Sequence, residues 1–218
     1  AQAEFAIWAG GNGGVMFKNG KWVLNSKENI QTMEFLKKLT DQKLTQPNPA
    51  KCDRTACAQA LFAAGKAAFI NGSVFLEGWL KDNGGAAINL GSGSFVAAPG
   101  KKPVTLGVQD YFTAYKANGH KAEIAKFMDF IFEPTNYAAF LKAAGGFIPA
   151  TKSAGVNAAK DPKLAPFIKL LPSAIFYPGD QASWPAVKGA IQQQVGTALV
   201  NPKKTMDALQ AKALAASK

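Results

Sequence analysis

Apolar residues recur at helical spacing in several parts of the chain. Ile30, Met33, Leu36 and Leu39 follow such a spacing, which predicts an amphipathic helix ending near Lys43. Asn25 is the expected cap, with Glu28 completing a capping box. Similar patterns, bounded by capping residues, glycine or proline, predict further helices at 53–64, 73–80, 124–132, 135–144, 162–171, 182–199 and from 201 onwards.

Short apolar runs bounded by turn residues predict strands between these helices. They lie at 66–70, 94–99 and 111–115, and Asn19-Gly20 predicts a hairpin across 15–24. The opening of the chain is dense in glycine over residues 6–14. Strands that alternate with helices and give way to a helical C-terminal cluster indicate an α/β fold.

Charge narrows the classes of partner. The 218 residues carry 25 Lys+Arg and 14 Asp+Glu, a formal net charge of +11, and Arg54 is the only arginine. Because base and phosphate recognition favours the guanidinium fork over a lysine point charge, we expect a solvated lysine surface and no nucleic-acid partner. The alternative is a basic adhesion module that binds anionic surfaces, which salt would weaken.

Cysteine and histidine content limits metal chemistry and indicates a compartment. His120 is the only histidine, and Cys52 and Cys57 are the only cysteines, too few for a structural zinc site or a catalytic triad. We expect neither metal nor cofactor. The two cysteines form either a short-loop disulfide, the favoured interpretation, or two free thiols. A disulfide indicates export to an oxidising compartment, and no apolar run is long enough to span a membrane.

Aromatic and short polar side chains occur together at the ends of predicted elements. Flat rings with short hydrogen-bonding groups suit an uncharged, hydroxyl-rich ligand, so carbohydrate is the leading ligand class. Each ring can equally be a core residue. The candidates are Phe5 and Trp8; Asn71, Gly72, Ser73 and Phe75; and Asp180, Trp184 and Lys188.

A carbohydrate-active enzyme is the catalytic alternative. Such an enzyme needs two carboxylates flanking the scissile bond, and only Asp110 and Asp180 lie away from predicted helix surfaces. We therefore expect binding without turnover.

Several longer segments resemble one family. They are "LFAAGKAAFINGSVFLEGWL" at 61–80, "VTLGVQDYFTAYKANGHKAEIAKFMDFIFEPTNYAAFLKAAGGFIPA" at 104–150, and "QASWPAVKGAIQQQVGTALVNPKKTMDAL" at 181–209. Together with "GKWVLNSKENIQTMEFLKKLTDQ" near the start, they resemble the extracellular solute-binding proteins of ABC sugar importers, the maltose-binding-protein-like type. The resemblance runs over nearly the whole chain.

This resemblance implies a two-lobed, type II periplasmic-binding-protein fold that captures a sugar or oligosaccharide in an interlobe cleft and delivers it to membrane permease subunits. Phe5 and Trp8 match an aromatic contact loop, residues 71–75 a second contact loop, and Trp184 a ring that stacks on sugar. Gln109 and Asp110 match a hinge crossing and are further candidate ligand contacts. The family's tryptophan after Gly-Pro is absent here, where the sequence reads Gly72-Ser73-Val74-Phe75.

The family's chains are longer at the N-terminus, so this chain resembles their C-terminal portion. On that basis 1–108 is part of the ligand lobe, 109–150 belongs to the other lobe, and 151–218 forms helices packing on the ligand lobe. A missing N-terminal segment or a second copy of the chain is then an expected partner. The expected location is periplasmic or extracellular, either free or as a membrane-associated lipoprotein. The rings near both ends are expected to converge on one crevice.

Overall fold

The computed structural model describes residues 2–116 and 119–218, which form two compact units. Unit 1 comprises Ala1–Ile70, Gly93–Gly107 and Pro172–Lys218, and unit 2 comprises Asn71–Ser92 and Val108–Leu171. Residues 71–92 and 151–171 thus group with the 109–150 segment, which sequence analysis had set apart. The assignment of these segments to lobes of a larger protein stays a prediction.

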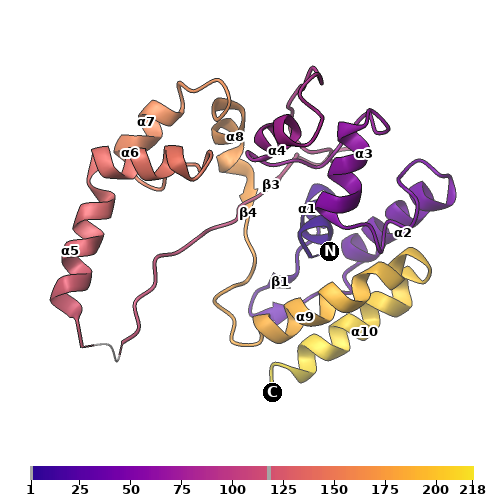
Figure 1. Cartoon of the computed structure of the whole chain (residues 1–218). Coiled ribbons are helices and arrows are strands. Elements are labelled where there is room, and N and C mark those ends of the chain that lie inside the picture. The colour runs from indigo at the N-terminus through magenta and orange to yellow at the C-terminus, as the bar shows by residue number, and fades with distance from the viewer. Residues whose placement is uncertain (1, 117–118) are drawn as a thin grey trace. The chain divides into compact units, whose positions relative to one another are not determined.

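Unit 1 is built around helices from both ends of the chain. Its longer helices are α1 (Gln2–Gly11), α2 (Lys27–Asp41), α9 (Trp184–Gln194) and α10 (Pro202–Ala215), with a 3-10 turn, η3 (Val195–Leu199), joining the last two. α9 and α10 lie side by side (Figure 1). Their apolar faces share one core with α1, α2 and the hairpin, in which Ile191, Met206 and Leu209 are fully buried.

The first helix corrects an expectation. Residues 2–11 form α1 and not a contact loop, because the alanine-rich opening favours helix and can bury Phe5 and Ala9 in the unit 1 core. Gly10 and Gly11 end the helix, and a Cβ on Gly11 would lie 2.6 Å from the backbone oxygen of Val96.

The hairpin prediction is confirmed. β1 (Phe17–Lys18) pairs antiparallel with β2 (Lys21–Trp22), and Asn19 and Gly20 both adopt positive φ, 50° and 75°, as a tight two-residue turn requires. The helix that follows is also confirmed, but Ser26 and not Asn25 caps α2, accepting from the Asn29 backbone N–H. Asn25 instead donates to Asp207 of α10 at 2.9 Å.

The strand predictions at 66–70, 94–99 and 111–115 are wrong: these residues form no ladder. The second described sheet pairs β3 (Thr105–Leu106) in parallel with β4 (Ala174–Ile175). A strand needs a neighbour as well as apolar, β-branched or aromatic residues, and each predicted segment lacks a partner ladder among the described residues.

Helices α4 (Leu76–Asp82), α5 (Lys121–Phe132), α6 (Pro134–Ala143), α7 (Lys152–Ala158) and α8 (Ala165–Leu170) form unit 2. The helix pair predicted at 124–132 and 135–144 is confirmed, although Glu133 and not Thr135 caps α6. Ser73 does not cap α4, which begins after Phe75 without a side-chain cap. No helix among the described residues is long and apolar enough to cross a membrane.

Candidate functional site

Three contacting aromatic rings mark one end of α9 in unit 1. The rings of Trp22 and Trp184 are stacked with centroids 6.3 Å apart, and Tyr177 stacks on Trp184 at 5.3 Å and 24°. Trp22 and Trp184 are buried, at 4% and 9% exposed, whereas Tyr177 is only partly buried. Tyr177 is therefore the ring of this set that solvent reaches most readily; we call Trp22, Trp184 and Tyr177 the ring stack.

Hydrogen bonds fix the inner end of the ring stack. Trp22 Nε1–H is shared between the hydroxyls of Ser183 and Ser217, at 3.1 and 3.0 Å. Gln210 of α10 donates to the Trp22 carbonyl at 2.8 Å and accepts from the Leu24 N–H at 2.7 Å. The hairpin and both C-terminal helices thus hold Trp22, and Trp184 packs on it as the first residue of α9.

An exposed ion pair joins α1 to the segment that follows Cys52. Arg54 Nη2 donates to Glu4 Oε1 of α1 at 2.9 Å, and the side chains are 51% and 42% exposed. In the ring stack, burial raises the pKa of Tyr177 above its ordinary value.

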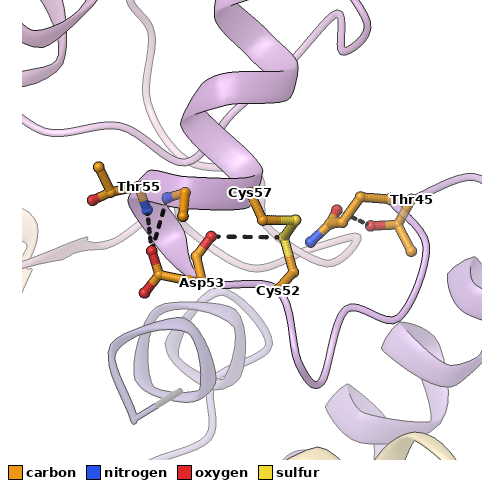
Figure 2. The surroundings of a disulfide bond; sticks show 7 residues. Thr45, Cys52, Asp53, Thr55 and Cys57 are labelled. Carbon is orange, nitrogen blue, oxygen red and sulfur yellow. Dashed lines mark hydrogen bonds between the residues drawn. A yellow bond between two sulfur atoms is a disulfide. The ribbon is translucent and has the colours of Figure 1, made fainter.

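A disulfide and two backbone hydrogen bonds constrain the segment that carries Arg54. Cys52 and Cys57 form a disulfide, which confirms the favoured interpretation. Between them a π-helical turn, η1 (Arg54–Gln59), begins after Asp53, whose carboxylate accepts from the N–H groups of Thr55 and Ala56, both at 2.8 Å (Figure 2). These backbone hydrogen bonds hold the pKa of Asp53 below its ordinary value.

A second group of rings involves α1 and α2. Trp8 packs edge-on against Phe95 at 4.8 Å and tilted against Phe35 at 5.9 Å. Trp8 and Trp184 therefore contact different ring groups, and no described ring contact links the two groups. Phe5 is 2% exposed and packs in the core. The structure gives Phe5 and Trp184 clear packing roles, and their ligand contacts stay predictions.

The candidates at 71–75 lie in unit 2. Gly72 and Ser73 are exposed, and the Ser73 carbonyl accepts from the Leu76 N–H at 3.0 Å. Phe75 is 43% exposed and packs edge-on against Phe147 at 5.2 Å. Asn71 is partly buried. Their ligand role stays a prediction.

The remaining candidates are polar side chains near the surface. Gln109 accepts from the Tyr111 hydroxyl at 2.6 Å, and Asp180 accepts from the Gln181 amide at 2.9 Å. Asp110 is exposed, and Lys188 is partly buried one turn beyond Trp184 on α9. Gln109 and Asp110 follow the point where the chain passes from unit 1 into unit 2.

The candidate ligand-binding residues suggested by the sequence do not include Glu4, Arg54, Trp22 or Tyr177. Tyr177 could have been found because it shares the short segment "YPGDQASW" with Trp184, and Arg54 because it is the only arginine. Glu4 and Trp22 carry no such signal, since only the tertiary structure brings α1 to Arg54 and the hairpin to Trp184.

In one surface groove, lysines alternate with carboxylates. A groove between α2 and α10 is lined by Lys37, Lys38, Lys203 and Lys204 together with Glu34, Asp41 and Asp207. Within it Lys37 pairs with Asp41 and Lys203 with Asp207, both at 2.6 Å. Lys203 and Asn25 hold the pKa of Asp207 below its ordinary value. Among the described residues no group of three metal-binding side chains occurs.

Known structures share this fold. The chain superposes on maltose-bound MalE3 of T. maritima with a TM-score of 0.74 and 19% identity, covering 98% of this chain and 56% of that one. It superposes on an ABC transporter solute-binding protein from Thermotoga lettingae bound with α-D-tagatose with a TM-score of 0.78 and 13% identity, covering 99% of this chain and 56% of that one. It superposes on a cyclo/maltodextrin-binding protein complexed with maltotetraose with a TM-score of 0.71 and 21% identity, covering 98% of this chain and 56% of that one. The chain spans about half the length of these structures.

A comparison with curated proteins finds no match. The family model described as bacterial extracellular solute-binding protein matches residues 1–166. The fold expected from the resemblance, the type II periplasmic-binding-protein fold, is confirmed by the solved structures, and the extracellular location is confirmed by the family. The chain therefore belongs to the bacterial extracellular solute-binding proteins.

Proposed function

We propose that this protein captures a neutral sugar or oligosaccharide outside the cell and delivers it, chemically unchanged, to the permease of an ABC importer. The observation that carries the proposal is the ring stack of unit 1, which ends in a partly exposed tyrosine, in a member of a solute-binding family. Aromatic faces with adjacent polar groups suit the C–H faces and hydroxyls of a sugar.

The ligands in related structures support the choice of solute. The titles of solved structures with this fold describe complexes with maltose, α-D-tagatose and maltotetraose. Delivery to a permease follows from the resemblance to importer components and is part of the same proposal. Turnover is not expected, because the two candidate carboxylates, Asp110 and Asp180, are both exposed.

Binding is tested by titrating the full chain with maltose, maltotetraose and D-tagatose and following tryptophan fluorescence and heat of binding. Saturable binding of at least one sugar is expected, with leucine as the negative control solute. Tyr177→Leu keeps apolar volume but removes the planar face, and it should weaken binding about fivefold or more. Tyr115→Leu, a change at an 86% exposed tyrosine, is the matched control and should leave binding unchanged.

The same samples test the absence of chemistry. Incubation with maltotetraose should release no shorter sugar, measured by chromatography after hours at room temperature. Binding of leucine but of no sugar would contradict the proposed solute class, and release of maltose would contradict the proposed transport role.

A further inference from the structure

A buried indole N–H in unit 1 has two hydroxyl acceptors. Trp22 is 4% exposed, and its Nε1–H can only donate. It donates to Ser183 Oγ at 3.1 Å and to Ser217 Oγ at 3.0 Å, and the two hydroxyl oxygens lie 3.2 Å apart. A buried donor without an acceptor is costly, so these two serines, which we call the hydroxyl pair, satisfy a requirement of the buried ring.

The hydroxyl pair is supplied by two different helices. Ser217 follows α10 and its hydroxyl donates to the Ala213 carbonyl in the last turn of that helix at 2.9 Å. A hydroxyl that donates its one proton there keeps both lone pairs for other donors, so Ser217 is set up to accept from Trp22. Ser183 directly precedes α9, and Trp22 itself lies in the hairpin. Three segments far apart in the chain therefore meet at one indole N–H.

Ring contacts connect Trp22 to the outermost ring of the stack. Phe17 packs edge-on against Trp22, with ring centroids 5.0 Å apart and an interplanar angle of 68°. Trp184 stacks on Trp22 at 15°, and Tyr177 stacks on Trp184 at 24°. Because closely packed rings cannot tilt independently, the plane of Trp22 sets the plane of Trp184 and, through it, that of Tyr177.

The hydroxyl pair thus acts on the outer ring through an unbroken series of contacts. Resting on the function proposed above, we propose that Ser183 and Ser217 are positioning residues for sugar binding: their hydroxyls hold the Trp22 indole and so preset the face of Tyr177 on which a saccharide stacks. In this role neither serine touches the sugar. A preset face lowers the entropy lost when the ligand binds. Since one hydroxyl suffices as an acceptor, the serines are redundant, and only the loss of both frees the indole.

The test is calorimetry on the full chain with whichever of maltose, maltotetraose and D-tagatose binds most tightly. Ser183→Ala and Ser217→Ala should each weaken binding less than about twofold, because the other hydroxyl still accepts from Trp22. The double serine variant should weaken binding about tenfold, more than two independent effects would give. Ser183→Ala combined with Ser217→Thr keeps one hydroxyl and should bind within about twofold of the unaltered protein.

Trp22→Phe tests whether the serines act through the indole. Phenylalanine keeps a ring but has no N–H for the serines to hold, so this variant should lose about as much affinity as the double serine variant. Adding Ser183→Ala and Ser217→Ala to Trp22→Phe should then cost less than about twofold more, since no donor is left unsatisfied. The Trp22→Phe background also decides the matter if the double serine variant alone does not fold.

Thr205→Val is the control for a general loss of stability in unit 1. Thr205 is 7% exposed, and its hydroxyl lies 2.9 Å from that of Thr197 in η3. Removing this buried hydroxyl should lower the melting temperature by a few degrees and leave the sugar affinity unchanged. Near-ultraviolet circular dichroism, which reports on stacked tryptophan rings, should change in the double serine variant and not in Thr205→Val.

The outcomes distinguish this inference from the proposed function. If the unaltered protein binds a sugar and the double serine variant binds it equally well, the inference is overturned and the proposed function stands. The same holds if the serine substitutions still cost about tenfold in the Trp22→Phe background, or if Thr205→Val weakens binding as much as they do. If no tested sugar binds at all, the proposed function fails and the inference fails with it.

Discussion

Unit 1 and unit 2 have similar helix content but very different interiors. In unit 1, fifteen buried residues form one apolar core drawn from α1, the hairpin, α2, α9 and α10. Among the described residues of unit 2, the buried apolar ones are Leu76, Leu80 and Tyr137. Large side chains of α5 remain outside, with Phe127 and Phe130 at 52% and 61% exposed.

The difference shows that an amphipathic sequence can form a helix without burying its apolar face. α5 has an amphipathic sequence and forms as expected, yet none of its residues is buried, because a helix buries its apolar face only when another element covers it. The ring centroid of Phe112 lies 5.8 Å from that of Phe132 and 5.8 Å from that of Phe140. These ring contacts do not form a closed core. We therefore expect unit 2 to be the less stable unit.

The largest expected effect is in the unit 1 core. Leu209 is fully buried on α10, so Leu209→Ala should lower the free energy of unfolding by about 2–5 kcal/mol, measured by urea denaturation followed by circular dichroism. Leu214→Ala is the control on the same helix, where the side chain is 51% exposed, and it should cost less than about 0.5 kcal/mol. Equal costs for the two variants would contradict the packed core described for unit 1.

A smaller effect is expected at a buried tyrosine of unit 2. Tyr137 is 5% exposed, and its hydroxyl accepts from the Ala150 N–H at 3.1 Å. Tyr137→Phe removes this acceptor and should destabilise unit 2 by about 0.5–1.5 kcal/mol. Hydrogen exchange of α6 amides should accelerate, while exchange in α10 stays the same.

Tyr115→Phe, at an exposed tyrosine of the same unit, is the control for Tyr137→Phe and should change nothing. Acceleration in α10 as well would mean that the two units unfold together, and the comparison between them would lose its meaning.

The smallest effect is expected at the edge of unit 1 and depends on pH. Hydrogen bonds from Ala56 and Thr55 lower the pKa of Asp53. A carboxyl with a lowered folded-state pKa stabilises the fold above its unfolded value of about 3.9 and loses that contribution as pH falls through the folded value. Asp53→Ala should therefore lower the melting temperature slightly at pH 7, and the difference from the unaltered protein should shrink as pH falls below about 4. A pH-independent difference would indicate a cause other than the charged cap.

Local sequence signals predicted much of this protein correctly. The hairpin at Asn19-Gly20, the amphipathic helix after residue 25, the helices at 124–132 and 135–144 and the cap-and-proline start of α10 are all present. Each depends on residues close in the chain, whose turn geometry, capping groups and apolar spacing act within a few residues. The resemblance over long segments then indicated the family, which the match over 1–166 establishes.

Tertiary contacts decided the rest. Phe69 and Tyr111 lie in segments with strand-like composition, but they stay 93% and 73% exposed because strands form only against a partner ladder. Residues 2–11 became a helix because Phe5 and Ala9 could enter a core built mainly by the other end of the chain. The Arg54–Glu4 ion pair and the ring stack each join segments that lie far apart in the chain. Short-range patterning fixes which elements can form, whereas long-range packing selects which of them form and which side chains share a site.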